Sequence, residues 1–319
     1  MIIHMKNNFL LALLAISLIV IVVQICEGWS VLFGSQTNQV QPRWRDLAYG
    51  ELGTREKLDI YLPDEGQGPF PVIIHIHGGA WMAGSKSADA SIAGLKRGYA
   101  VVAVGYSLSQ EAKYPRQIFE IKAAIRWLRA NAEKYKLNPD KFAVWGESAG
   151  GHLAALAGTS GDVNDLEDMT MGNSNQSSRV QAVVDLFGPI DLTVLATQQK
   201  EAGINNPMVS DPNTCPEAML LGAPVVKVQD LAKKASSSTF ISKDDPPFFI
   251  QHGKEDNLIP YQQSVDFEEK LAEVIGKDKV QLELLEGVGH GGPAFSTPDN
   301  LDKIFKFLDK YLKDDNPNK

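Results

Sequence analysis

Apolar residues in this chain fall into short runs separated by helical patterns. The runs predict strands at 58–62, 71–76, 100–104, 141–145, 180–187, 247–251 and 280–285. The runs at 71–76 and 100–104 are almost wholly apolar and β-branched, which is typical of strands covered on both faces. Helical spacing predicts helices over 115–135 and 301–312, and small residues predict another over 149–157. Lys122, Arg126 and Arg129 lie between the apolar positions of the first helix.

This alternation predicts an α/β fold with a mostly parallel central sheet and helices on both faces. One stretch, from Asp191 to Asp245, has helical fragments, proline and serine but no strong strand. Structureless loops of that length are uncommon and often functional. We therefore expect residues 191–245 to form a lid-like insertion after the sixth strand of the fold, the one predicted at 180–187. A surface excursion without a role is the alternative.

The N-terminus differs from the rest of the chain. Lys6 precedes an apolar run over 9–23 that only Ser17 interrupts, as in the basic start and apolar middle of a secretion signal. The run is short for a membrane-spanning helix, which needs about 20 apolar residues. We expect residues 1–28 to be a signal peptide or N-terminal anchor, 29–43 a tether and 44–315 the folded domain. The expected protein is exported: secreted, periplasmic or held at a membrane by residues 1–28. Cleavage after Gly28 and lipid attachment at Cys26 both stay open.

The composition of the chain argues against several classes of protein. Hydrophobic residues make up 44% of the 319 residues, enough for a sizeable core, and the formal net charge is −8. An acidic protein repels nucleic-acid phosphates, so no nucleic-acid partner is expected. Two cysteines do not make a disulfide scaffold, and no cysteine or histidine cluster has the spacing of a zinc site. The oligomeric state does not follow from these patterns.

Residues 146–150 (GESAG) fit the G-x-S-x-G pattern of a nucleophile elbow. The context agrees, because a predicted strand enters the motif and a predicted helix leaves it. Glycines at both ends remove side chains that would collide in the sharp turn, which leaves Ser148 exposed above the sheet. The start of the helix favours negative charge. Ser148 is therefore the expected nucleophile of an α/β-hydrolase fold.

A serine hydroxyl needs a base, and the base needs an orienting acid. Of the six histidines, His290 alone lies in a glycine-rich loop after the last predicted strand. Asp256 follows the strand predicted at 247–251 and is the expected acid, with Glu255 as its neighbouring competitor. The chain order Ser148, Asp256, His290 is the order that this fold uses.

Residues 77–81 (HGGAW) follow the strand predicted at 71–76. This is where the fold places the loop whose N–H groups stabilise the oxyanion. We expect the donors to be the backbone N–H groups of Gly79, Ala80 and Ala149. Trp81 and Tyr106 are the candidate substrate-binding residues.

The motifs HGGAW at 77–81, GESAGGH at 146–152 and GHGG at 289–292 resemble those of hormone-sensitive-lipase-like α/β hydrolases. The stretches PPFFIQHG at 246–253 and IPYQQS at 259–264 make the chain most similar to the bacterial acetyl-xylan and feruloyl esterase type. The resemblance covers roughly residues 44–312. It implies hydrolysis of carboxylic esters without metal or organic cofactor, often on acylated plant polysaccharide.

Other functions stay open at this level. The same triad serves a lipid-like ester, an aryl formamide or a peptide, and a non-catalytic binding protein can be built on the same fold. Met219, Leu220 and Leu221 in the insertion either line an acyl pocket opposite Trp81 or form the lid's own small core.

Overall fold

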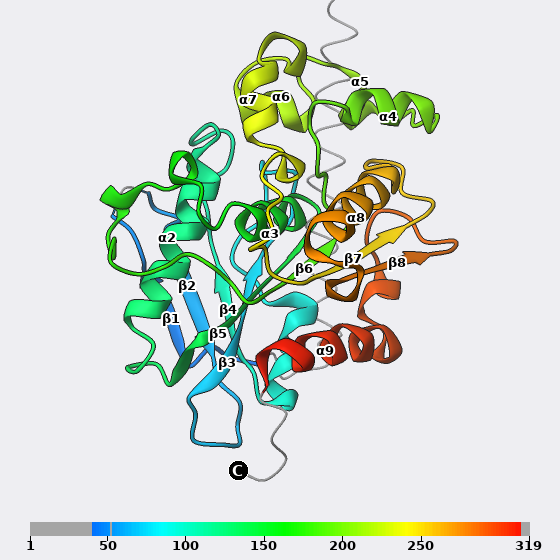
Figure 1. Ribbon diagram of the computed structural model, residues 1–319. Coiled ribbons are helices and arrows are strands. Elements are labelled where there is room, and N and C mark those ends of the chain that lie inside the picture. The colour runs from blue at the N-terminus through cyan, green and yellow to red at the C-terminus, as the bar shows by residue number, and fades with distance from the viewer. Residues whose placement is uncertain (1–39, 52, 314–319) are drawn as a thin grey trace, which may run out of the picture. The chain divides into compact units, whose positions relative to one another are not determined.

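The computed structural model describes residues 40–51 and 53–313. In this part of the chain the strands form one eight-stranded sheet, with the order β1-β2-β4-β3-β5-β6-β7-β8. β2 pairs antiparallel with β1 and with β4, and all other neighbours are parallel, so the predicted mostly parallel sheet is confirmed (Figure 1). The strands are β1 (Trp44–Ala48), β2 (Lys57–Tyr61), β3 (Phe70–Ile76), β4 (Ala100–Val104), β5 (Leu137–Glu147), β6 (Ala182–Leu186), β7 (Phe248–Gly253) and β8 (Val280–Leu285).

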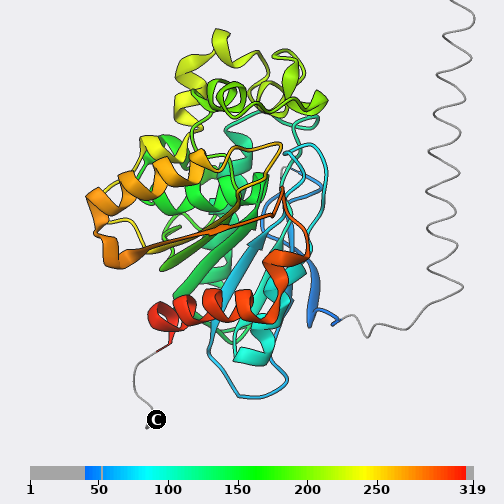
Figure 2. The same ribbon diagram turned by 90° about the vertical axis from the view of Figure 1, so that its right-hand side faces the viewer.

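Helices cover both faces of the sheet, as predicted (Figure 2). One face packs against α2 (Arg116–Ala130), α3 (Ala149–Thr159) and α8 (Gln262–Ile275), and the other against α9 (Pro298–Leu312) and the 3-10 helix η1 (Asp89–Arg97). The period of two along β3 shows how this works. Val72 and Ile74 belong to the first core cluster, whereas Ile73 between them belongs to the second. Central strands that are apolar on both faces therefore hold the two layers together.

The strand β1 and the helices α8 and η1 were not predicted. β1 is an edge strand whose side chains are at most half-buried, so its sequence carries no clear apolar run. α8 has buried Phe267 and Leu271 on one side but many charged residues on the other. The predicted strands and helices are confirmed, with shifts at their ends.

The insertion consists of short helices, as expected, and contains no strand (Figure 1). These are α4 (Leu195–Glu201), α5 (Pro207–Ser210), α6 (Pro216–Leu221), η4 (Val225–Lys227), α7 (Gln229–Lys234) and η5 (Ser237–Thr239). Leu220 and Leu221 are buried in the same core cluster as Trp81, while Met219 is half-buried. The two leucines therefore extend the main core of the domain, and they do not form a separate core within the lid.

The expected targeting segment, residues 1–28, and most of the tether lie outside the described residues. Among residues 40–51 and 53–313, no helix combines the length and apolar character needed to cross a membrane.

Two charged side chains of α2 do not face solvent. Lys122 and Arg126 are fully buried, because the segment 160–179 folds over them. Glu167 in that segment accepts from both: Lys122 Nζ lies 3.2 Å from Glu167 Oε1, and Arg126 Nη1 bonds Oε2. Lys122 Nζ also donates to the Ser160 carbonyl at 2.6 Å. Burial lowers the pKa of Lys122, and Glu167 opposes that shift.

We expect Glu167→Gln to lower the free energy of unfolding by about 3–5 kcal/mol, because it leaves two buried cations without their counter-ion. Denaturant titration measures this, with the exposed Glu269→Gln on α8 as the control. Equal stability of the two variants would show that the cluster contributes nothing.

Candidate active site

Ser148 sits at a strained turn between β5 and α3. Its φ of 53° and ψ of −120° are values that residues with a side chain rarely adopt. A Cβ on Gly146 would lie 2.1 Å from the Gly150 carbonyl oxygen, and one on Gly150 would lie 2.0 Å from the Ile76 carbonyl oxygen. Only glycine fits at both positions. The Ser148 N–H donates to the Leu186 carbonyl at 2.9 Å, which ties the turn to β6.

The structure brings together the three residues expected from the sequence. His290 Nε2 lies 2.9 Å from Ser148 Oγ, and His290 Nδ1 lies 2.7 Å from Asp256 Oδ2. The Phe187 ring packs edge-to-face with the imidazole, with ring centroids 4.9 Å apart. A ring held at both nitrogens and on one side is oriented to take a proton from the serine hydroxyl. Glu255, the competing acid, does not contact His290.

Asp256 is buried, and both of its oxygens have partners. Oδ1 accepts from the N–H groups of Leu258 and Ile259 at 2.8 and 2.9 Å, and Oδ2 faces His290 and His252. Burial acts to raise the pKa of Asp256, but hydrogen bonds from the two histidines outweigh it and hold the pKa below its usual range. The carboxylate is therefore ionised at neutral pH, as an orienting acid must be.

His252 is a site residue that sequence reasoning discounted. It is fully buried, and its Nε2 lies 3.2 Å from Asp256 Oδ2 and 2.9 Å from the Ile259 carbonyl oxygen. Two acceptors at Nε2 assign the proton to that atom, so Nδ1 accepts from the Ser264 hydroxyl at 2.7 Å. His252 thus holds Asp256 from the side opposite His290. The spacing of four residues between His252 and Asp256 was the only signal in the sequence.

The loop over residues 77–81 has an unusual backbone. Gly79, Ala80 and Trp81 have φ values of 108°, 55° and 57° in succession. In the described part of the chain, the N–H groups of Gly79, Ala80 and Ala149 donate to no protein acceptor. Such free donors are available to a ligand oxygen, which is what an oxyanion hole requires.

Trp81 and Tyr106 are placed differently from the expectation. The exposed fractions of the two residues are 2% and 0%. The Trp81 indole N–H donates to His152 Nδ1 at 3.3 Å, and the Tyr106 hydroxyl donates to the His77 carbonyl at 2.9 Å. The Tyr106 ring also stacks on His77, with centroids 4.2 Å apart. Because both side chains are buried and engaged, they support the 77–81 loop and present no surface to a substrate.

His152 is buried between the loop and the insertion. Its Nε2 lies 2.6 Å from the Ala235 carbonyl oxygen, so this nitrogen donates while Nδ1 accepts from Trp81. Burial lowers the pKa of His152 to about 4. The neutral ring therefore joins Trp81 to the insertion at neutral pH.

A cavity of about 630 Å³ lies between the insertion and the loop that carries Asp256. Most of its lining side chains are polar, and one is aromatic. They include Gln198, Glu201, Asn205, Lys254, Asn257, Tyr261 and Gln262.

The BD-FAE family model matches residues 58–271. The chain belongs to the BD-FAE family. This is a family of α/β-hydrolase esterases of the bifunctional acetyl xylan/feruloyl esterase type. The resemblance stated from the motifs is therefore confirmed.

Individual relatives agree with the family. The chain is 35% identical over 246 residues to the probable carboxylic ester hydrolase LipM of Mycobacterium tuberculosis, covering 75% of this chain and 54% of LipM. It spans about half the length of the curated relatives it matches.

Solved structures confirm the α/β-hydrolase fold. A truncated carbohydrate esterase from gut microbiota superposes with a TM-score of 0.77 and 32% identity, covering 85% of this chain and 97% of that one. A bifunctional GH43-CE protein of Bacteroides eggerthii gives 0.75 and 35%, covering 84% of this chain and 35% of that one.

Asp185 on β6 supports the start of α3. It is fully buried, and its Oδ1 accepts from the Gly188 N–H at 3.0 Å. A Cβ on Gly151 would lie 2.4 Å from the same oxygen, so helix and carboxyl are packed in contact. Burial raises the pKa of Asp185 to about 7.

This shift predicts a pH dependence of stability. Between pH 4 and pH 7 the unfolded chain loses the Asp185 proton while the folded chain keeps it. The group therefore stabilises the fold at low pH, and the contribution is lost as pH rises through that window. We expect the free energy of unfolding of Asp185→Asn, relative to the wild type, to rise by up to about 1.4 kcal/mol per pH unit across it. Denaturant titrations at several pH values measure this, with exposed Asp64→Asn as control. A constant difference would show that Asp185 ionises normally.

Proposed function

We propose that this protein is a serine carboxylesterase in which Ser148, His290 and Asp256 form the catalytic triad. The observation that carries the proposal is the continuous hydrogen-bonded relay from Ser148 Oγ through His290 to Asp256, with separations of 2.9 and 2.7 Å. Membership of the BD-FAE family supports it. A binding protein on this fold has no need of such a relay.

The geometry implies the usual two-step acyl transfer. Ser148 Oγ attacks the ester carbonyl carbon while His290 Nε2 takes the hydroxyl proton, and Asp256 stabilises the resulting imidazolium. The carbonyl oxygen becomes an oxyanion, which the free N–H groups of Gly79, Ala80 and Ala149 stabilise. His290 then gives the proton to the leaving alcohol. A water molecule, deprotonated by His290, then attacks the acyl carbon; the bond to Ser148 Oγ breaks, the acid leaves, and His290 returns the proton to Ser148 Oγ.

We further propose that the leaving alcohol is a carbohydrate hydroxyl carrying a short or aromatic acyl group. The solved relatives described as carbohydrate esterases support this. The cavity beside the Asp256 loop also supports it, because amide, carboxylate and ammonium side chains match sugar hydroxyls and Tyr261 offers a ring face. Lipid-like esters, aryl formamides and peptides are the competing substrates.

Ser148→Ala is expected to lower kcat/KM for a small acetyl ester by about 10⁴-fold or more, because the members of a triad act as one unit. Turnover measurements report the loss of catalysis, and labelling by an active-site serine phosphonate reports the loss of the reactive serine. Ser174→Ala, in an exposed loop, is the matched control and should keep full activity and labelling. A folded Ser148→Ala enzyme with a tenth of wild-type turnover would disprove the assignment.

Tyr261→Ala tests the carbohydrate substrate. We expect kcat/KM for acetylated xylan to fall about tenfold, while kcat/KM for p-nitrophenyl acetate, which lacks the sugar, is unchanged. Steady-state kinetics on both substrates provide the comparison within one variant. An equal change for both substrates, or no change for either, would contradict a sugar site in this cavity.

A further inference from the structure

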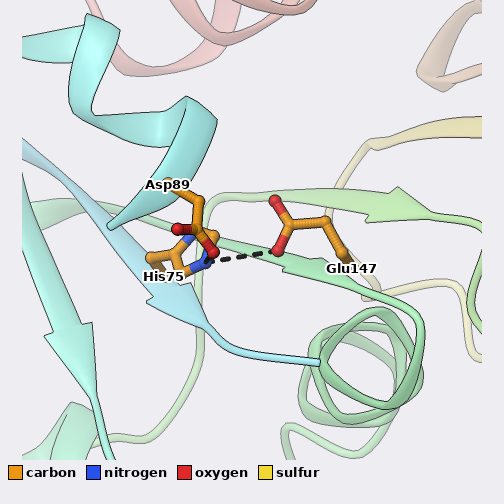
Figure 3. A group of neighbouring side chains, drawn as sticks. All are labelled: His75, Asp89 and Glu147. Carbon is orange, nitrogen blue, oxygen red and sulfur yellow. Dashed lines mark ion pairs between the residues drawn. The ribbon is translucent and has the colours of Figure 1, made fainter. Parts of the chain in front are cut away.

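A second cluster of chemically active side chains lies behind the nucleophile elbow, away from the triad. His75 is on β3, Glu147 is the last residue of β5 and Asp89 is the first residue of η1. Figure 3 shows the three side chains converging on one point. Glu147 directly precedes Ser148 in the chain, so whatever binds this cluster also holds the elbow.

The separations suit a small metal ion. His75 Nε2 lies 3.2 Å from Glu147 Oε2 and 3.9 Å from Asp89 Oδ2, and all three ligand atoms lie within 4.8 Å of one another. Zinc bonds to histidine nitrogen and carboxylate oxygen are about 2.0–2.2 Å long, so two ligands of a tetrahedral site are about 3.4 Å apart. The two measured separations from Nε2 lie on either side of that value.

The His75 imidazole lacks the partners that a buried ring needs. Its exposed fraction is 0%, and within the described residues neither ring nitrogen makes a hydrogen bond. The 3.2 Å approach to Glu147 does not have hydrogen-bond angles, although it brings opposite charges together when the ring is protonated. A buried polar atom without a partner costs free energy and points to a ligand that the protein atoms do not supply.

The local charge favours a cation. The carboxylates of Glu147 and Asp89 lie 3.2 and 3.9 Å from His75 Nε2, and each carries a negative charge when ionised. Two carboxylates also neutralise a divalent ion. Asp89 is 64% exposed in its side chain, so the cluster borders solvent on that side.

We propose that His75, Asp89 and Glu147 form a binding site for one divalent transition-metal ion of the Zn²⁺ type. Imidazole and carboxylate are ligands that Zn²⁺ accepts. The ion would join β3, β5 and η1 at the back of the elbow, and so it has a structural role. It takes no part in the acyl transfer, because none of its three ligands belongs to the triad. The competing occupant is a proton, which would make the ring an imidazolium paired with the two carboxylates.

Zinc titration of chelator-treated full-length protein tests the site. Isothermal titration calorimetry should show one equivalent of Zn²⁺, and a hundredfold excess over Kd should raise Tm by about 5 °C. Asp89→Asn, on the exposed side of the cluster, should weaken binding at least tenfold and so reduce the Tm shift by about half or more. Glu147→Gln should do the same, while Asp64→Asn should bind as the wild type does.

Three outcomes would overturn the proposal. The His290→Ala variant should retain the zinc equivalent, because the proposed site does not include the triad. Loss of binding in that variant would place the ion on His290 and overturn the proposal. The proposal also fails if wild-type protein shows no saturable heat, since a proton then suffices at His75, or if Asp89→Asn binds as tightly as the wild type. None of these outcomes depends on esterase activity.

Discussion

The structure is organised around the strained turn at Ser148. A nucleophile with φ of 53° between a central strand and a helix requires backbone to approach backbone closely. Gly146 and Gly150 meet this need, because a Cβ on either would lie about 2 Å from a carbonyl oxygen. The surrounding sheet must be stiff enough to hold the turn, and strands β3 to β7, buried on both faces, provide that stiffness. Strain of this kind persists only where the surroundings over-determine it.

Buried polar groups around the turn are arranged in layers. Ser264 bonds His252, His252 bonds Asp256, and Asp256 bonds His290. Each group fixes the tautomer or ionisation of the next, which keeps the imidazole oriented for catalysis. The 77–81 loop is held in a similar way, because Trp81 donates to His152 and Tyr106 donates to the His77 carbonyl. The chemistry therefore depends on residues that never reach a substrate.

The sequence was informative where a local pattern carries the information. Apolar runs located the central strands, and glycine-flanked motifs located Ser148 and His290. It was uninformative where tertiary packing decides the outcome. Lys122 and Arg126 have the spacing of a solvent face, yet Glu167 from a later segment allows their burial. Trp81 ends the 77–81 motif and Tyr106 follows β4, and both side chains are buried. His75, Asp89 and Glu147 are brought together only by the parallel register of β3 with β5 and by η1, so no spacing rule could have detected them.

The ionisation or pairing of the carboxyl groups near the elbow limits their repulsion of the oxyanion. The reaction places a negative oxyanion near the start of α3, and an ionised carboxylate buried nearby would oppose it. Asp185, in contact with that helix, has its pKa raised to about 7 and is largely protonated below that pH. Glu147 faces His75, whose proton or bound cation compensates its charge. Asp256 is ionised, and it lies next to the imidazole that becomes positive during attack. Of these three carboxyl groups, Asp256 is therefore the one whose negative charge faces the triad imidazole that becomes positive in the transition state.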